Sequence, residues 1–342
     1  MKAAVYYDVG DIRYEDVATP TIESEEVLLR MQSCGLCGTD IHKIVHKSVQ
    51  TPCVLGHEVA GEVVECGSRV KKFQPGDRVF VAHHVPCFSC RLCSRGHFTL
   101  CRQFKESNII PGGFAEYIRV PAENVKSTML RLPEEMTFDE GSMIEPLATV
   151  LHGASFLRIR QGDRALVMGA GQIGALWIQV LKSMNVNWIA TSDVSVYKLD
   201  RAKKIGADEV IDVSREDLCE VVKEKTKGEG VDIIIIAVGV PSLFSLALNC
   251  ISLGGQIMMF AIFPPNQQIA IDASRICTDE IAVLGSYSSM PTEYLPALEM
   301  IQRKSFHVRD MITHRMHLSE LKEAVDLATR KDSDSLKIMI HP

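Results

Sequence analysis

A glycine-rich turn between an apolar run and a helical segment constrains this fold more than any other feature of the sequence. Residues 164–168 form a short apolar run that leads directly into Gly169-x-Gly171-x-x-Gly174. Residues 175–184 then repeat apolar side chains at helical spacing. A lone glycine pattern of this kind is weak evidence. A strand before it and a helix after it, however, are the context that a dinucleotide-binding βαβ unit requires.

An acidic residue completes the dinucleotide pattern. Asp193 lies nineteen residues past Gly174, after a second predicted strand at residues 188–191. The glycines let the backbone approach a pyrophosphate at the helix N-terminus, and the acid accepts hydrogen bonds from the adenosine ribose. An aspartate here repels a 2′-phosphate, and Val194-Ser195 offers no arginine to bind one. The sequence therefore favours NAD over NADP.

Strand and helix patterns keep alternating after this unit. Further strands are expected at residues 209–213, 231–239, 256–262 and 282–287, with helices at 198–205, 216–226 and 241–251. The run at 231–239 is continuously apolar, as in a strand that is buried on both faces. Six strands with helical crossovers predict a parallel, doubly wound α/β sheet.

The first 153 residues follow a different pattern. Short β-branched or alternating runs bounded by Gly, Pro and Asp predict strands at residues 2–7, 26–33, 58–66, 78–82 and 115–120. This is typical of a small-stranded barrel or sandwich. With 342 residues, the chain is long for a single core, so we expect two domains.

Four cysteines inside this block have the spacing of a metal site. Cys87, Cys90 and Cys93 are three residues apart, and Cys101 follows on the same polar loop. Four thiolates can converge on one tetrahedral Zn²⁺ and leave no position for water, which indicates a structural ion. The alternative, four unrelated core cysteines, is disfavoured by the spacing.

A second set mixes three ligand types within one short segment. Cys37 supplies a thiolate, His57 an imidazole and Glu58 a carboxylate. This combination suits Zn²⁺ at an open catalytic site with three protein ligands. A buried cysteine or histidine on its own is more often a core residue than a ligand, so the prediction depends on the surrounding pattern.

That pattern resembles a known family. The segments CGTDIH (37–42), GHEVAGEVVECGSRV (56–70), EPLA (145–148) and the glycine turn are similar to the signatures of zinc-containing alcohol dehydrogenases, in the medium-chain dehydrogenase/reductase superfamily. The similarity covers essentially the whole chain. It implies a GroES-like catalytic domain at 1–153 with a structural zinc lobe at about 86–102, an inserted NAD-binding Rossmann domain at 154–287, and a return to the catalytic domain at 288–342, which ends in a strand at 335–340.

The resemblance also implies roles for single residues. Thr39 would pass the substrate proton through the cofactor ribose to His42. Without the flanking pattern of Cys37 and Asp40, a turn residue and a solvated histidine would be the preferred interpretation of these two. Glu145 would lie beside the catalytic zinc, as a ligand or through water, and Lys198 beside the ribose. His83, His84 and His152 are three further candidates to face the cleft, and the sequence does not distinguish among them. The cofactor positions are Gly169, Gly171, Ile173, Gly174, Asp193, Lys198, Ala261, Ile262, Ser286 and Tyr287. The other cysteines, predicted to be core thiols, are Cys34, Cys53, Cys66, Cys219, Cys250 and Cys277.

Two zinc ions and NAD together imply a zinc-dependent oxidoreductase. It would move a hydride between NAD and a secondary alcohol, such as a polyol, a sugar alcohol or its phosphate, in the cleft between the domains. L-Threonine 3-dehydrogenase or another zinc alcohol dehydrogenase is the alternative, although Ala148-Thr149 stand where threonine dehydrogenases usually have Gly-Asn. A regulatory zinc-loop protein is a third possibility, which the intact mixed ligand set disfavours.

Composition narrows the choice of partners. The net charge is −6 and basic residues are scattered, which disfavours nucleic acid. Eleven cysteines behind an N-terminus without an apolar signal segment favour metal ligation and reduced thiols. We expect a cytoplasmic protein that is not bound to a membrane and forms homo-oligomers, either dimers or tetramers.

Overall fold

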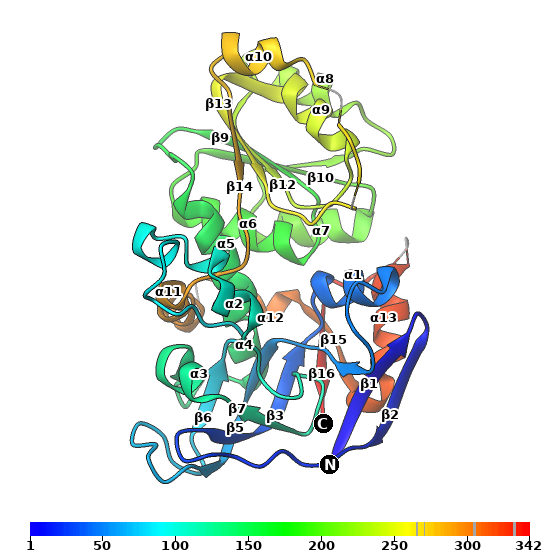
Figure 1. Ribbon diagram of the computed structural model, residues 1–342. Coiled ribbons are helices and arrows are strands. Elements are labelled where there is room, and N and C mark those ends of the chain that lie inside the picture. The colour runs from blue at the N-terminus through cyan, green and yellow to red at the C-terminus, as the bar shows by residue number, and fades with distance from the viewer. Residues whose placement is uncertain (265, 270, 304–305, 331–332) are drawn as a thin grey trace. The chain divides into compact units, whose positions relative to one another are not determined.

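The computed structural model describes residues 1–264, 266–269, 271–303, 306–330 and 333–342 (Figure 1). The chain divides into two compact units. Unit 1 comprises Met1–Ala148 and Ser289–Pro342, and unit 2 comprises Thr149–Ser288. In sequence, unit 2 is therefore an insertion into unit 1. In the described part of the chain, every helix is too short or too polar to span a bilayer.

Unit 2 contains the predicted parallel sheet, with strand order β11-β10-β9-β12-β13-β14. The strands are β9 (Arg164–Met168), β10 (Trp188–Asp193), β11 (Glu209–Asp212), β12 (Val231–Ile236), β13 (Ile251–Met259) and β14 (Ala282–Gly285). The four isoleucines of β12 are completely buried, as expected for a strand with both sheet faces covered. The order reverses between β9 and β12, and in such sheets ligands bind at the carboxyl ends of the strands beside this point.

Helices connect these strands. They are α6 (Gln172–Ser183), α7 (Val196–Ile205), α8 (Leu218–Lys225), α9 (Ser242–Cys250) and α10 (Ala273–Thr278). Trp177 of α6 is completely buried and meets the Phe260 ring edge-on at 5.3 Å between centroids. Cys277, predicted to be a core thiol, is exposed instead. The prediction was wrong because α10 buries none of its residues.

Unit 1 is built on β-sheets. A three-stranded sheet has the order β2-β1-β4, and a seven-stranded sheet runs β15-β16-β3-β5-β6-β8, with β7 paired to β3. The predicted strands correspond to β1 (Lys2–Asp8), β3 (Val27–Gly35), β5 (Glu58–Cys66), β6 (Arg78–Val81), β7 (Tyr117–Val120) and β16 (Lys337–His341). Strands missing from the prediction are β2 (Asp11–Asp16), β4 (Cys53–Val54), β8 (Met129–Arg131) and β15 (Ile312–His317). These four are short or largely polar, so they lack a clear apolar alternation.

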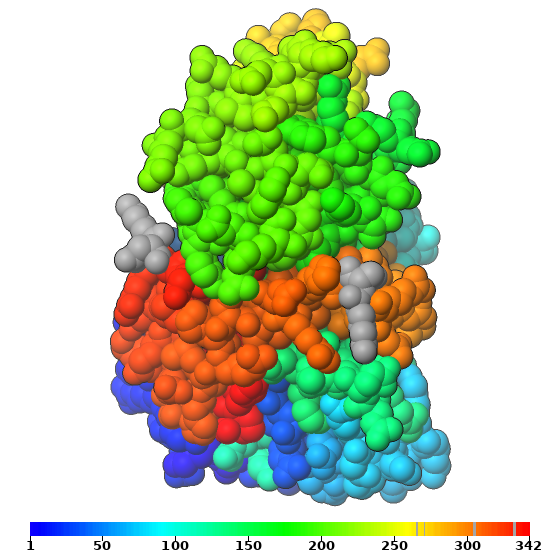
Figure 2. Space-filling view, turned by 180° about the vertical axis from the view of Figure 1, so that it is seen from behind, coloured from blue at the N-terminus to red at the C-terminus, as the bar shows by residue number. Residues whose placement is uncertain are grey.

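The C-terminal segment completes the core of unit 1. Strand β16 pairs antiparallel with β3, with Met339 opposite Gly35 and Ile340 opposite Cys34. Coloured orange to red, this segment forms much of the visible face of unit 1 in Figure 2. The helices of the unit are α1 (Gly38–His46), α2 (Arg102–Glu106), α3 (Ala122–Ser127), α4 (Phe138–Ser142), α11 (Pro291–Gln302), α12 (Val308–Met311) and α13 (Leu321–Thr329), while α5 (Ile144–Ser155) runs from unit 1 into unit 2. The pairing places Lys337, the first residue of β16, inside the unit.

Candidate active site and metal centres

The three residues of the predicted catalytic metal site lie together in unit 1. One ligand atom from each of Cys37, His57 and Glu58 lies within 4.8 Å of the other two. Cys37 is the N-cap of α1, where its Sγ accepts a hydrogen bond from the Thr39 amide at 3.4 Å. A helix N-terminus stabilises a thiolate, which is the form that binds metals. His57 precedes β5 and Glu58 begins it, so the strand brings both side chains to Cys37.

Asp40 orients this set, a role that the sequence analysis did not assign. Its completely buried carboxylate accepts hydrogen bonds from the amides of Cys37 and Gly56 and lies 3.3 Å from His57 Nδ1. Contact with Asp40 through Nδ1 leaves His57 Nε2 for a metal, which is the usual carboxylate–histidine–metal arrangement. Burial alone would lower the pKa of His57, but the charges of Asp40 and Cys37 outweigh it and raise that pKa well above its usual value.

Glu58 has one partnered and one unpartnered oxygen. Its Oε2 pairs with the ammonium of Lys337, which also donates to the carbonyl of Leu36 at 3.1 Å. Its Oε1 is buried and has no hydrogen-bond partner among the described residues. Gly35 allows this close packing, because a Cβ there would lie 2.0 Å from Glu58 Oε2. An unpaired buried oxygen is costly unless something else satisfies it, and a cation held with Cys37 and His57 fits this requirement.

Glu145 lies in the first turn of helix α5. The family resemblance implies a loop at EPLA, whereas the structure has a helix there. Pro146 is compatible with a helical first turn because the amides there have no helical acceptor. Burial, together with the charge of Glu58, raises the pKa of Glu145 to about 7, against an opposing effect of His57. Glu145 is thus buried within reach of the charges of the metal set, but among the described residues it is not one of the three whose ligand atoms lie within 4.8 Å of one another.

The two residues assigned to proton transfer lie on α1, and both are half-buried. Thr39 and His42 are three positions apart, so they share one face of the helix. The Nε2 atom of His42 is buried without a partner in the described part of the chain. Its ring packs at a tilt of 50° against that of His46, with 4.6 Å between the centroids. Burial lowers the pKa of His42, and the charge of His46 lowers it further. The lowered pKa favours the neutral imidazole of His42, which is the form that can accept a proton.

Of the three unranked histidines, His83 is the one in contact with the metal set. Its ring lies 4.7 Å from that of His57 and 3.8 Å from that of His84, which in turn packs on Phe104. Burial lowers the pKa of His83 well below its usual value, and that of His84 to about 4. Both rings are therefore neutral near pH 7. His152 of α5 packs instead on Phe156, the residue that follows the end of this helix.

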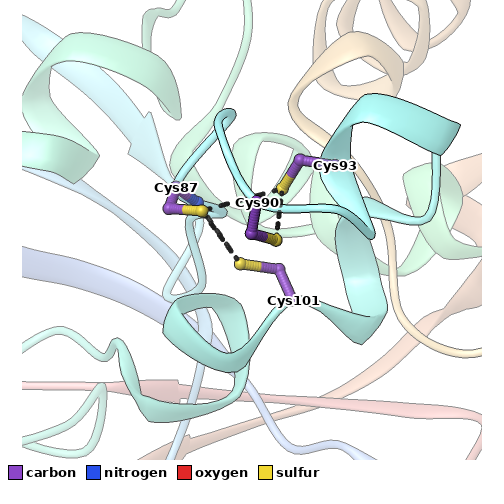
Figure 3. Close-up of side chains that lie close together, drawn as sticks. All are labelled: Cys87, Cys90, Cys93 and Cys101. Atoms are coloured by element: carbon purple, nitrogen blue, oxygen red, sulfur yellow. Dashed lines mark hydrogen bonds between the residues drawn. The ribbon is translucent and has the colours of Figure 1, made fainter.

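The four cysteines of the predicted structural site converge (Figure 3). Their sulfurs lie within 4.8 Å of one another, with 3.5 Å between Cys87 and Cys101 and 3.6 Å between Cys90 and Cys93. Hydrogen bonds, first of all from the Ser89 amide, lower the pKa of Cys87 to about 6. The small apolar cluster of this lobe consists of these cysteines with Phe98 and Phe104. A lobe with so little apolar core depends on its metal, and four thiolates form a closed zinc site.

The glycine turn in unit 2 has the geometry of a phosphate-binding turn. Gly169 has a φ of +104°, and a Cβ on Gly174 would lie 1.9 Å from the Gly169 carbonyl oxygen. A Cβ on Gly171, by contrast, would have no neighbour within 4 Å. Gly171 is the N-cap of α6, so this open space lies at a helix N-terminus, where an anion is stabilised. Ile173 is in the first turn of the same helix.

The remaining cofactor positions lie at the carboxyl ends of the strands. Asp193 ends β10, and its carboxylate accepts hydrogen bonds from the amides of Ala170 and Ser195, each at 2.9 Å. Lys198 is half-buried in the first turn of α7. The other four positions follow the last residues of β13 and β14 and are Ala261, Ile262, Ser286 and Tyr287. In a parallel sheet these ends share one edge with the glycine turn.

Comparison with known proteins agrees with this geometry. Residues 23–133 match the family model for the alcohol dehydrogenase GroES-like domain, and residues 173–303 match the zinc-binding dehydrogenase model. A sorbitol dehydrogenase of Bombyx mori is 34% identical, over 99% of this chain and 98% of its own length. An L-threonine 3-dehydrogenase of Colwellia psychrerythraea is 33% identical, over 90% of each chain.

A solved structure agrees as well. Galactitol-1-phosphate dehydrogenase from Escherichia coli superposes over the whole of both chains with a TM-score of 0.89 at 27% identity. The family resemblance in the sequence is thus confirmed. The chain belongs to the zinc-dependent alcohol dehydrogenases of the medium-chain dehydrogenase/reductase superfamily, in the branch that includes the sorbitol and threonine dehydrogenases.

Proposed function

We propose that this protein oxidises the secondary hydroxyl of a polyol, a sugar alcohol or a sugar-alcohol phosphate, with NAD⁺ as the hydride acceptor. The observation that carries the proposal is the meeting of Cys37, His57 and Glu58 beside the buried acid Glu145. When bound by these three residues, zinc supplies the positive charge that makes an alcohol hydroxyl acidic near neutral pH. Asp40 holds His57 in the tautomer that such a site needs.

Each remaining residue has a task in this reaction. Thr39 and His42 take the hydroxyl proton away along one face of α1, and the neutral imidazole of His42 is its acceptor. The neutral rings of His83 and His84 border the metal set without adding charge that would oppose a cation. Glu145 would lie beside the metal, as a ligand or through water, because its carboxyl is buried within reach of the charges of His57 and Glu58.

The cofactor is proposed to bind along the carboxyl edge of the sheet in unit 2. Gly171 leaves room for the pyrophosphate at the N-terminus of α6, and Gly174 keeps that helix close to the turn. Asp193 and Lys198 border the ribose. Asp193 favours NAD, because its carboxylate would repel the 2′-phosphate of NADP.

L-Threonine is the second candidate substrate, because a threonine dehydrogenase matches this chain almost as well as a sorbitol dehydrogenase does. The test is a panel of polyols, sugar-alcohol phosphates, simple secondary alcohols and L-threonine, each supplied with NAD⁺ and followed by NADH absorbance. A kcat/KM for a polyol or its phosphate that exceeds the value for threonine supports the first proposal. The reverse order would establish threonine, and activity with NADP⁺ alone would overturn the choice of cofactor.

We further propose a homo-oligomer, a dimer or a tetramer, in the cytoplasm. Strand β14 supports assembly because it is an edge of its sheet, and Ala282, Val283 and Gly285 are exposed along it. None of the eleven cysteines, all of which lie in the described part of the chain, is in a disulfide, which fits a reducing compartment. Light scattering of the purified protein measures the oligomeric state directly.

A further inference from the structure

Two cysteines outside both metal sites lie unusually close together in unit 2. Cys219 is the second residue of α8, and Cys250 is the last residue of α9. Their sulfurs are 3.0 Å apart, although the residues are separated by 31 positions in sequence. The two helices pack on each other and lie side by side in Figure 1. These two sulfurs are closer than the hydrogen-bonded sulfurs of the four-cysteine lobe, which are 3.5 to 3.9 Å apart.

The surroundings of the pair argue against a third metal site. In the described part of the chain, the groups of three or more potential ligands are the two already discussed. Neither Cys219 nor Cys250 belongs to them. Two thiols without further ligands do not make a zinc site, which takes four ligands when it is structural. Two adjacent sulfurs have another chemistry open to them, the formation of a disulfide bond of about 2.05 Å.

The two sulfurs differ in their access to solvent. Cys219 is half-buried and lines a cavity of about 550 Å³, together with Asp217, Lys223 and Arg275. Cys250 is 1% exposed, and burial raises the pKa of its thiol. A small oxidant therefore reaches Cys219 through the cavity, whereas Cys250 is buried and has the sulfur of Cys219 3.0 Å away. In this arrangement an oxidant would react with Cys219 first, and Cys250 would then react with the oxidised Cys219.

We propose that Cys219 is a site of reversible oxidation by hydrogen peroxide and that Cys250 resolves it to an intramolecular disulfide. In the first step the Cys219 sulfur attacks peroxide, an S–O bond forms, the O–O bond breaks and one water leaves. In the second step the Cys250 sulfur attacks Cys219, the S–S bond forms, the S–O bond breaks and a second water leaves with the proton of the Cys250 thiol. Peroxide gains two electrons, and each thiol gives one.

The position of the pair predicts what the bond does. Cys250 directly precedes Ile251, the first residue of β13, whereas the cofactor positions Ala261 and Ile262 follow the last residue of that strand. Nine strand residues, about 30 Å, separate the two ends. The disulfide therefore fastens α8 to α9 without reaching the carboxyl edge of the sheet. It should leave turnover unchanged and raise the thermal midpoint of unit 2.

The test uses the zinc-loaded protein, treated with small molar excesses of hydrogen peroxide, alkylated and digested without reductant. We expect mass spectrometry to find a peptide pair linked through Cys219 and Cys250, lost on treatment with dithiothreitol, while both zinc ions are retained. In Cys250→Ser, dimedone should label Cys219 as a sulfenic acid. The matched control Cys277→Ser, which removes an exposed thiol of the same unit, should still form the linked pair.

Two results would overturn the proposal. One is full alkylation of both Cys219 and Cys250 in wild-type protein after other cysteines have been oxidised. The other is a linked pair that joins different cysteines. Both are read from the wild-type protein, so neither depends on the folding of a variant.

Discussion

The carboxylate of Glu58 and the ammonium of Lys337 form an ion pair in which both side chains are completely buried. They come from β5 and β16, 279 residues apart in sequence. A buried pair of this kind adds little net stability compared with an apolar pair, but the loss of one partner leaves an uncompensated buried charge. Lys337 thus balances one oxygen of Glu58 and leaves the other for a metal.

Replacing Lys337 by Met should destabilise the protein by about 3–5 kcal/mol, because Glu58 would remain buried without its counter-ion. Urea unfolding measures the loss. The double variant Glu58→Gln/Lys337→Met should recover much of it, since no charge is then left unpaired, and Lys337→Arg is the charge-conserving control. Equal destabilisation in the single and double variants would show that the charge pairing is unimportant.

The two metal sites should be separable by mutation. Cys37→Ala removes the thiolate of the open site, so it should abolish turnover while leaving the thermal midpoint close to that of wild type. Cys93→Ala opens the closed site and should lower the thermal midpoint first, because the lobe has little apolar core. Zinc content, measured by mass spectrometry, should fall by one ion in each variant. Equal loss of folding in both variants would contradict separate roles.

Cofactor choice should depend on Asp193. The double variant Asp193→Ala/Val194→Arg removes the charge that repels a 2′-phosphate and adds one that binds it. The ratio of kcat/KM for NADP⁺ to that for NAD⁺ should rise by roughly 10- to 100-fold. Asp193→Asn is the control for the structural role, because an amide oxygen can still accept a hydrogen bond from Ala170 or Ser195. A wild-type enzyme that already prefers NADP⁺ would refute the prediction.

The stability of the protein should fall at acidic pH because Asp139 becomes protonated there. Burial alone would raise the pKa of Asp139, but hydrogen bonds from His341, Ser33 and Arg315 outweigh it and lower that pKa to about 2. The unfolded chain then binds the proton first as the pH falls, so this stabilisation is complete above about pH 4 and is lost towards pH 2. Once partial solvent screening is allowed for, it amounts to about 1–2 kcal/mol.

The measurement for Asp139 compares unfolding of wild type and Asp139→Asn at several pH values. The gap in stability between them should stay constant above about pH 4 and narrow below it. A gap that does not change with pH would mean that the substitution acts through packing alone.

Local patterns in the sequence were enough to predict much of this molecule. The apolar run of β12, the glycine turn and the cysteine spacing each reflect a constraint within a few residues. The first two, with the alternation of strands and helices, predicted the parallel sheet in unit 2, and the third predicted the four-cysteine cluster. Strand β2, by contrast, has the sequence DIRYED. It is half-buried or exposed along its length, and with Ile12 and Tyr14 as its two apolar residues it gives only a weak strand pattern. It is a strand only because β1 offers it a partner.

The residues that the sequence analysis missed are joined by long-range contacts. Nothing near Lys337 in the sequence distinguishes it from a surface lysine, and only the pairing of β16 with β3 brings it to Glu58. Cys219 and Cys250 are likewise brought together only by the packing of α8 on α9. Asp40 left a usable local signal, because an acid three residues after an N-cap predicts a capping box.

Glu145 should control the rate of the reaction more than the retention of the metal. Its ligand atoms are not among those that lie within 4.8 Å of one another in the metal set of the described residues, yet its side chain is buried and the charges of His57 and Glu58 act on it. A carboxylate that exchanges with metal-bound water is a ligand for only part of the cycle, since zinc can move between four and five coordination. Glu145→Gln should therefore keep nearly stoichiometric zinc and lose about 10- to 100-fold in kcat.

The matched control is Glu140→Gln, which alters another buried glutamate. Glu140 is paired with Arg309, so its substitution should affect stability while leaving kcat near wild type. Full kcat in Glu145→Gln, or loss of zinc in parallel with kcat, would rule out this part-time role.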